Sequence, residues 1–541
     1  MSAGASPPAR DSFDVVIIGT GAAGLVSACV AADAGLSVAV LEKAELLGGT
    51  SAVSGGVMWI PDNHLMGEDF PDSADQGLAY LTAATHGTVP ASQLRWYIDT
   101  GREAVRYLSE KTHVALTPLP RPDYHPEWPG AVHGGRSLDN APFDGAAYPG
   151  LSARLRPPTY FPAITMGERD AMAATGLDAE LVDRRNREGT RTMGGALVCA
   201  LLLSAEERGV VVGNGQDVRG LARNDASQWV LNVRHRGADR SLAAGAVVFA
   251  SGGFEWNPRL QAAFLPNPVT PISAPSNEGD GLEMAVAAGA AVDNMTAVWG
   301  VPVLQDPEHI YDGRPSGRMA NVELTLPGSI LVNLRGRRFV NEATSYHDLN
   351  KAFRTIEPSI GRHANIPAWM IYDSRYQSRY AVGGLPAGAP PPWAMRAVNL
   401  RGLALECGIE PDALESTVEE FNHDAADGVD RNFGRGSSTQ DRHLGDPGNE
   451  PNPCLAPLQE APFYGIPISA GTLGTCGGLV TDDDGQVLDW SDMPIPGVYA
   501  AGNVSAGVFG DAYPGGGATL GSAVTRAYAV GRALAASAAN H

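Results

Sequence analysis

The stretch DVVIIGTGAAGLVSACVAADAGLSVAVLE, residues 14–42, decides the fold. Its first residues form a β-branched run that ends at Gly19, which predicts a buried parallel strand. Residues 22–35 follow with helical spacing and close at a glycine, and residues 37–43 form a second apolar run. Strand, helix and strand in this order predict a βαβ unit, and therefore an α/β protein with a Rossmann-like sheet.

The first turn of this unit carries a glycine pattern typical of dinucleotide binding. The candidate contacts are Gly19, Gly21, Ala22, Ala23 and Gly24. Glycines at this turn allow a pyrophosphate to approach the start of the helix closely. Glu42 ends the second strand, where an acid accepts a hydrogen bond from a ribose hydroxyl and repels the 2′-phosphate of NADP. The unit therefore predicts a site for FAD or NAD.

The loop after the second strand favours FAD. LLGGTSAVSGG, residues 46–56, contains two glycine pairs and three hydroxyl side chains, which suit the bulky second half of FAD. This stretch resembles the FAD-binding pattern of the fumarate-reductase-like flavoproteins, whose covalent members carry a histidine in this loop. Residues 46–56 contain no histidine, so the resemblance implies FAD held without a covalent bond.

Two more strand-to-glycine turns, at residues 244–254 and 497–507, complete the expected cofactor domain. We predict that this domain is discontinuous and comprises residues 12–282 and 460–541. Residues 283–459 contain mixed strands, proline-rich loops and an acidic helical stretch, and we interpret them as an inserted α+β catalytic domain that covers the substrate. Further predicted cofactor contacts are Lys43, Gly49, Thr50, Ser51, Ser54, Gly55, Gly56, Asp217, Val218, Ser251, Gly252, Asp280, Gly502, Asn503, Ala518, Thr519 and Leu520.

The bulk composition narrows the classes of function. At 541 residues the chain is long enough for two or three domains, with residues 1–11 expected to be a loose tail. A net charge of -21 with scattered Lys and Arg argues against a nucleic-acid partner. Asp14 and Asp33 interrupt the apolar stretch near the N-terminus, so no stable insertion into a membrane is expected.

The cysteines point to a reducing compartment. The five of them are far apart in the sequence and form no CxxC pair, zinc spacing or disulfide framework: Cys29, Cys199, Cys407, Cys454 and Cys476. This pattern predicts a cytoplasmic protein without a metal site, and it excludes a disulfide reductase.

The stretch GDAYPGGGATLG, residues 510–521, suggests the chemistry. If Gly517 starts a helix, its backbone N–H is an unpaired donor at the positive end of the helix dipole. Tyr513 stands four residues earlier and can aim its hydroxyl at the same point. Together the two donors would form an oxyanion site for a carbonyl that becomes an enolate.

Several motifs resemble those of the 3-ketosteroid Δ1-dehydrogenases, a family of FAD enzymes. They include AGNVSAGVFGDAYPGGGATLG at residues 501–521, GSILVNLRGRRFVNEATSY at residues 328–346 and PDYHPEWPG at residues 122–130. The resemblance extends from about residue 13 to 533 of the sequence. It implies removal of two hydrogens from the A ring of a steroid, the C2 hydrogen as a proton and the C1 hydrogen as a hydride to flavin N5.

The resemblance also implies roles for particular residues. Tyr513 and the N–H of Gly517 would bind the C3 carbonyl, Tyr346 would take the C2 proton, and Tyr124 would assist it. A free phenol has a pKa of about 10 and is a poor base at neutral pH, so Tyr346 is expected to need a neighbouring donor. Because the sequence shows no second nicotinamide fingerprint, we expect an external electron acceptor, such as a quinone-like compound or a dye.

Two residues depart from the pattern of this family, and they concern the range of substrates. Asp511 stands where members often have a histidine, and Arg121 stands where members have an aromatic residue that lines the pocket. A charged Arg121 at the mouth of the pocket would favour a steroid with a polar side chain, or else it faces solvent.

The sequence leaves several rival functions open. An enoate reductase of the fumarate reductase type would have a histidine before the glycines of GTLGTCGG, residues 471–478, and none is present. A related flavoprotein could instead oxidise the C4–C5 bond of a 3-ketosteroid, although the pair Tyr346 and Tyr124 favours C1–C2. A flavin-binding RNA-modification protein is disfavoured by the acidic composition.

Overall fold

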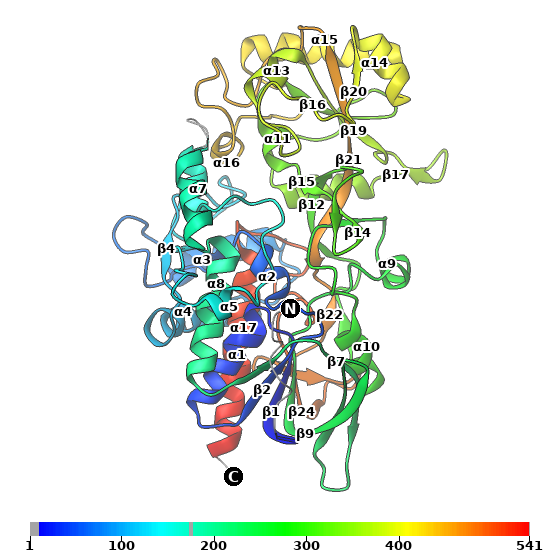
Figure 1. Cartoon of the computed structure of the whole chain (residues 1–541). Coiled ribbons are helices and arrows are strands. Elements are labelled where there is room, and N and C mark those ends of the chain that lie inside the picture. Colours follow the sequence, from blue (N-terminus) through cyan, green and yellow to red (C-terminus); the bar gives the residue numbers. More distant parts are fainter. Residues whose placement is uncertain (1–9, 173–176, 540–541) are drawn as a thin grey trace.

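The computed structural model describes residues 10–172 and 177–539, and two sheets organise them. The first sheet contains the βαβ unit and lies in the lower half of Figure 1. Its strand order is β23 (Gln486–Leu488), β24 (Pro494–Ala500), β9 (Ala238–Phe249), β1 (Ser12–Ile18), β2 (Val38–Leu41) and β6 (Val211–Gly213). The hairpin of β7 (Gln216–Arg223) and β8 (Trp229–His235) extends it from β9.

The centre of this sheet is parallel, from β24 through β9, β1 and β2 to β6. The last residues of β1 and β2, Ile18 and Leu41, are directly paired, and Phe249 of β9 pairs with Ile18 and with Ala500 of β24. The carboxyl ends of four strands therefore meet at one edge, where open α/β sheets bind their ligands. This arrangement confirms the predicted α/β class.

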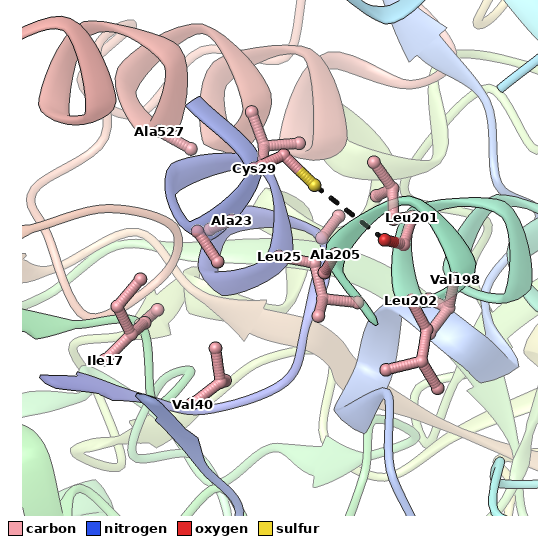
Figure 2. Close-up of a cluster of buried hydrophobic side chains, with 14 of the residues drawn as sticks. Ile17, Ala23, Leu25, Cys29, Val40, Val198, Leu201, Leu202, Ala205 and Ala527 are labelled. Carbon is pink, nitrogen blue, oxygen red and sulfur yellow. Dashed lines mark hydrogen bonds between the residues drawn. The ribbon is translucent and has the colours of Figure 1, made fainter. Parts of the chain in front are cut away.

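Helices α1 (Ala22–Asp33), α8 (Met193–Glu207) and α17 (Ala518–Ala539) pack together beside the first sheet. Figure 2 shows their contact, in which Cys29 and Leu25 of α1 lie against Leu201 of α8. α1 is almost wholly buried, which explains why its sequence is apolar on every side. A Cβ atom at Gly531 would overlap Val30, so a glycine in α17 allows the two helices to approach closely. This packing fixes the start of α17, which carries the predicted oxyanion site.

The second sheet lies in the upper part of Figure 1. Its strand order is β15 (Arg318–Met319), β12 (Val298–Leu304), β21 (Phe463–Thr475), β19 (Ala368–Tyr372) and β16 (Ser329–Asn333), and β10 (Thr270–Pro271) and β20 (Met395–Ala397) also pair with β21. β10 and β21 come from outside residues 283–459, so the second sheet draws strands from both sides of the predicted insertion. The division into domains stays a prediction.

The remaining helices and small sheets complete the described fold. The helices are α2 (Gly49–Val53), α3 (Ala74–Ala84), α4 (Ala91–Lys111), α5 (Pro149–Ser152), α6 (Met166–Met172), α7 (Ala179–Glu188), α9 (Pro258–Phe264), α10 (Asp280–Ala287), α11 (Asn321–Thr325), α12 (Tyr346–Lys351), α13 (Ser374–Arg379), α14 (Leu400–Cys407), α15 (Pro411–Asp427) and α16 (Thr439–His443). A three-stranded sheet comprises β3 (Met58–Trp59), β5 (Ser137–Asn140) and β4 (Leu116–Pro118). Short pairs are β11 (Val292–Asp293) with β22 (Gly478–Leu479), β13 (Ile310–Tyr311) with β14 (Arg314–Pro315), and β17 (Ile356–Glu357) with β18 (Arg362–His363). Within the described ranges, no helix has the length and apolar character needed to cross a bilayer.

Candidate active site

One large pocket extends from the glycine turn after β1 to the predicted catalytic tyrosines. Every cofactor and catalytic residue predicted from the sequence lines this pocket except Gly24 and Ala518. Gly24 lies behind the turn, where a Cβ atom would overlap the carbonyl oxygen of Gly19. Ala518 is buried as the first residue of α17. The fold thus brings together residues that are scattered along nearly the whole sequence.

The glycine turn is open to a ligand at one position and closed by packing at the others. Gly19 has a φ of +113°, a conformation that favours glycine, and it packs against the backbone at Ala250. Gly21 precedes α1, and a Cβ atom there would meet only the Ser51 hydroxyl, at 3.4 Å. Since α1 has no side-chain cap, its first N–H groups and its dipole are available to an anionic pyrophosphate.

Glu42 lies at the predicted place but already has partners. One carboxylate oxygen accepts hydrogen bonds from the backbone N–H of Thr20 at 3.1 Å and from its hydroxyl at 2.7 Å. The other accepts only from the N–H of Ala44, at 3.0 Å. A carboxylate has about four acceptor positions, so Glu42 keeps room for a ribose hydroxyl. Its role as the ribose acceptor stays a prediction.

The residues of the 46–56 loop fit the second half of FAD. The hydroxyl of Ser51 accepts the N–H of Ala22 at 3.0 Å, and that of Thr50 accepts the side-chain amide of Asn277 at 2.9 Å. These bonds hold the loop against the glycine turn, and its glycines leave space for a ring system. The residues present therefore fit FAD along the whole nucleotide end of the pocket.

The predicted oxyanion site is formed by the loop before α17. The backbone N–H of Gly517 lines the pocket and donates to no group in the described part of the chain. Gly517 has a φ of +104°, and a Cβ atom would lie 2.6 Å from the carbonyl oxygen of Val57, so only glycine fits here. The buried hydroxyl of Tyr513 accepts a hydrogen bond from Thr519 at 3.2 Å, which leaves its own proton free for a substrate oxygen.

Three tyrosines from distant segments meet beside this oxyanion site. The ring centroid of Tyr346 lies 5.3 Å from those of Tyr124 and Tyr513, and the rings of Tyr124 and Tyr513 are 5.7 Å apart. Tyr346 is the first residue of α12, while the N–H of Tyr124 donates to the carbonyl oxygen of Pro514 at 3.1 Å. The segment that carries Tyr124 is therefore anchored to the loop that carries Tyr513.

Burial raises the pKa of Tyr346 well above that of a free phenol, and the neighbouring phenols raise it further. Burial also raises the pKa values of Tyr124 and Tyr513, while hydrogen bonding by Tyr346, whose single proton can go to only one of them at a time, opposes this rise. The expected partner of Tyr346 is thus present, but Tyr346 is the donor. All three phenols therefore hold their protons at rest.

His347 packs next to Tyr513 and is hydrogen-bonded to Asp511. The N–H of Gly300 donates to Nδ1 of His347 at 3.2 Å, and Nε2 donates to the carbonyl oxygen of Asp511 at 3.1 Å. The carboxylate of Asp511 accepts a hydrogen bond from Arg354 at 2.7 Å. Asp511, which departs from the family pattern, is therefore a structural residue that fixes the loop.

Arg121 lines the pocket and is not a solvent-facing residue at its mouth. Its side chain is 14% exposed and binds Asp170 through two hydrogen bonds of 2.6 Å. Other lining residues carried no signal in the sequence, because they stand in no recognisable motif and reach the pocket only through the fold. They include Tyr160, Phe161, Met166, Arg169, Met319, Asn321, His443 and Leu473.

Comparison with known proteins assigns the chain to a family. The FAD binding domain family matches residues 14–520. The chain belongs to this family. The prediction of FAD binding is therefore confirmed.

The relatives of this flavoprotein have similar lengths. The 4-oxocyclohexanecarboxylate 2-dehydrogenase of Sinomonas cyclohexanicum is 38% identical over 98% of this chain and 94% of its own. The 3-oxosteroid 1-dehydrogenase of Mycolicibacterium smegmatis is 36% identical over 97% of this chain and 98% of its own. The crystal structure of 3-ketosteroid Δ1-dehydrogenase from Sterolibacterium denitrificans with 1,4-androstadiene-3,17-dione is 34% identical, with a TM-score of 0.90 over 98% of this chain and 100% of that one. The resemblance seen in the sequence is confirmed.

Proposed function

We propose that this flavoprotein is an FAD-dependent 3-ketosteroid Δ1-dehydrogenase, which introduces a double bond between C1 and C2. The observation that carries the proposal is the free N–H of Gly517 beside the hydroxyl of Tyr513 in the pocket. Two donors aimed at one point stabilise a ketone oxygen as it becomes an enolate oxygen, and so they acidify the neighbouring C–H.

Tyr346 is the proposed acceptor of the C2 proton. Because burial raises the pKa of Tyr346, its hydroxyl is protonated at rest. As the C2 proton arrives at the Tyr346 oxygen, the proton already there must pass to the neighbouring Tyr124, and Tyr124 must in turn release its own proton to water. FAD, when bound, supplies the acceptor for the C1 hydrogen and its two electrons. Glu42, the glycine turn and the 46–56 loop would hold it.

We also propose how FAD is held, which compound accepts the electrons, and where the protein is located. The lack of a histidine in residues 46–56 supports FAD without a covalent bond, and precipitation with acid should release all the yellow flavin. A quinone-like compound or a dye is proposed as electron acceptor. Five unpaired, buried cysteines support a location in the cytoplasm.

The rival reactions at C4–C5 or on an enoate have less support. The stretch of residues 471–478 lacks the histidine of the enoate reductases, while the paired Tyr346 and Tyr124 suit proton removal next to a ketone. The same chemistry applies to smaller cyclic ketones. The name of one relative, 4-oxocyclohexanecarboxylate 2-dehydrogenase, makes a one-ring ketone the second candidate substrate.

Anaerobic mixing of the yellow holoenzyme with androst-4-ene-3,17-dione tests the proposal. Bleaching of the flavin band together with formation of the 1,4-diene is the expected result. If the flavin stays oxidised with this steroid, yet dithionite reduces it, the steroid is not the substrate. Formation of a product desaturated elsewhere would support a rival reaction instead.

A further inference from the structure

The wall of the pocket beside Tyr124 carries positive charge. The Nε and Nη2 atoms of Arg121 bind Asp170, which leaves Nη1 without a hydrogen bond in the described structure. A Cβ atom built on Gly516 would lie 3.6 Å from this Nη1 and 3.4 Å from the Tyr124 hydroxyl. The free edge of the guanidinium group thus borders the same small space as a proposed catalytic phenol.

Arg169 adds a second cation to this wall. The only hydrogen bond of its guanidinium group in the described structure is a 3.6 Å contact with the sulfur of Met166, and no described carboxylate lies within ion-pair distance. Burial lowers the pKa of Arg169, and repulsion by Arg121 lowers it further. A buried cation that forms no ion pair is costly to keep.

The surroundings supply a further buried polar atom, and the acids nearest to Arg169 are Asp170, which binds Arg121, and Glu323, whose pKa is raised by burial. Nε2 of His443 is buried without a hydrogen-bond partner among the described residues and lies 3.6 Å from the Asp170 carboxylate. The acids that line the pocket are those of the predicted nucleotide end, Glu42, Asp217 and Asp280. The pyrophosphate of FAD is predicted at the start of α1, whereas this wall adjoins Tyr124. The pyrophosphate of FAD therefore does not account for these positive charges.

We propose that the ketone substrate carries a carboxylate, and that Arg169 binds this carboxylate together with the free edge of Arg121. The inference rests on the proposed desaturation next to a ketone and narrows its substrate class. A neutral steroid would leave Arg169 without an ion pair and Nη1 of Arg121 without a hydrogen-bond acceptor, whereas a carboxylate would satisfy both groups. The carboxylate could belong to a one-ring ketone, in which it lies one ring away from the carbonyl, or to an acid group on the far end of a steroid.

Matched acids and neutral compounds test this proposal on the holoenzyme. The pairs are 4-oxocyclohexanecarboxylate with its methyl ester, and 3-oxoandrost-4-ene-17β-carboxylate with androst-4-ene-3,17-dione. In at least one pair, kcat/KM for flavin reduction should be about 30-fold higher for the acid. The pair that shows the preference identifies the size of the substrate.

A ligand that cannot be desaturated gives an independent readout. 4-Hydroxybenzoate presents a phenol and a carboxylate at opposite ends of one ring, and its binding perturbs the flavin spectrum. It should bind about 30-fold more tightly than its methyl ester if the one-ring acid is the substrate. With the steroid acid as substrate, the same comparison is made with the 1,4-diene acid and 1,4-androstadiene-3,17-dione.

Substitutions then assign the preference to Arg169. Arg169→Met should reduce the ratio of acid to neutral compound by about tenfold or more, whereas Arg169→Lys should keep part of it. Arg106→Gln, on the exposed side of α4, is the control for the loss of one positive charge. Unchanged selectivity in Arg169→Met would overturn the assignment to Arg169.

Failure of the carboxylate inference and failure of the proposed desaturation give different results. If neutral ketones bleach the flavin as well as the acids do, the carboxylate inference is wrong and the proposed desaturation stands. If no ketone bleaches a flavin that dithionite reduces, both are wrong.

Discussion

The two ends of the pocket are built in different ways. The nucleotide end is built around a backbone turn within one continuous stretch, which glycines at 19, 21 and 24 shape. The ketone end is made of side chains from three distant segments, which carry Tyr124, Tyr346 and Tyr513. Changes at the first end should therefore act on folding and cofactor binding, and changes at the second should act on the reaction.

The largest expected effects come from the glycine turn. Gly24→Ala should lower the free energy of unfolding by about 4 kcal/mol or more and prevent recovery of flavin-loaded protein, because the added Cβ atom would overlap the carbonyl oxygen of Gly19. Gly21→Ala should fold, since its Cβ atom meets only the Ser51 hydroxyl, but should bind FAD more weakly. Urea denaturation and titration with FAD measure the two effects separately.

A surface glycine provides the control for this pair. Gly150→Ala has no atom within 4 Å of the added Cβ and should change stability by about 0.5 kcal/mol or less. Equal stability of Gly24→Ala and Gly150→Ala would refute the packing role of Gly24.

At the other end, Tyr346→Phe should leave folding and flavin content intact. The ring that packs against Tyr124 and Tyr513 is retained, while the proton acceptor is lost. Flavin reduction by the ketone should slow by about a thousandfold. Stopped-flow absorbance under anaerobic conditions measures this rate, and Tyr148→Phe, at a tyrosine that is 40% exposed, is the control. A rate near that of the unmodified protein would exclude Tyr346 as the base.

This contrast also explains what the sequence could predict. Glycine spacing predicted the turn, the strands and the place of Glu42, because all of them lie within one βαβ unit. The sequence did not predict that Thr20 and Ala44 donate hydrogen bonds to the carboxylate of Glu42. The hydrogen bonds of one side chain leave no pattern in the sequence.

The ketone end was predicted only where family motifs surround its residues, as they do for Tyr513 and Tyr346. Arg169 and His443 stand in no motif, and only the folding of α6 against α16 places them on one wall with Asp170. The raised pKa of Tyr346 also became visible only in the structure. It depends on burial and on the direction of a hydrogen bond, and the sequence shows neither.

The stability of the protein should depend on pH through His347, whose ring lies next to Tyr513, and this effect should be of intermediate size. Burial lowers the pKa of His347 to about 4, below the ordinary value of 6.5 that it regains on unfolding. The unfolded chain therefore binds more protons between these values, so the stability that neutral His347 provides is complete above the unfolded pKa and is lost as the pH falls toward the folded pKa. The loss should amount to about 3 kcal/mol.

Denaturation in urea at about pH 7 and about pH 4 checks this linkage. His347→Gln should show a loss of stability over this range that is smaller by about 2–3 kcal/mol, because glutamine does not titrate. Identical pH profiles for the two proteins would mean that His347 is not held neutral by its contacts with Gly300 and Asp511.

The smallest expected effect tests how the oxyanion site is oriented. The hydroxyl of Thr519 donates to that of Tyr513, so the proton of Tyr513 points elsewhere and is available to the ketone. Thr519→Val should slow flavin reduction about fivefold, the value of one ordinary hydrogen bond. Tyr513→Phe should slow it about a hundredfold, because it removes a donor to the developing enolate. Thr82→Val, at an exposed threonine bonded within its own helix, is the control. If Thr519→Val were as damaging as Tyr513→Phe, the hydroxyl that touches the ketone would be that of Thr519, and the oxyanion site would lie at the first turn of α17.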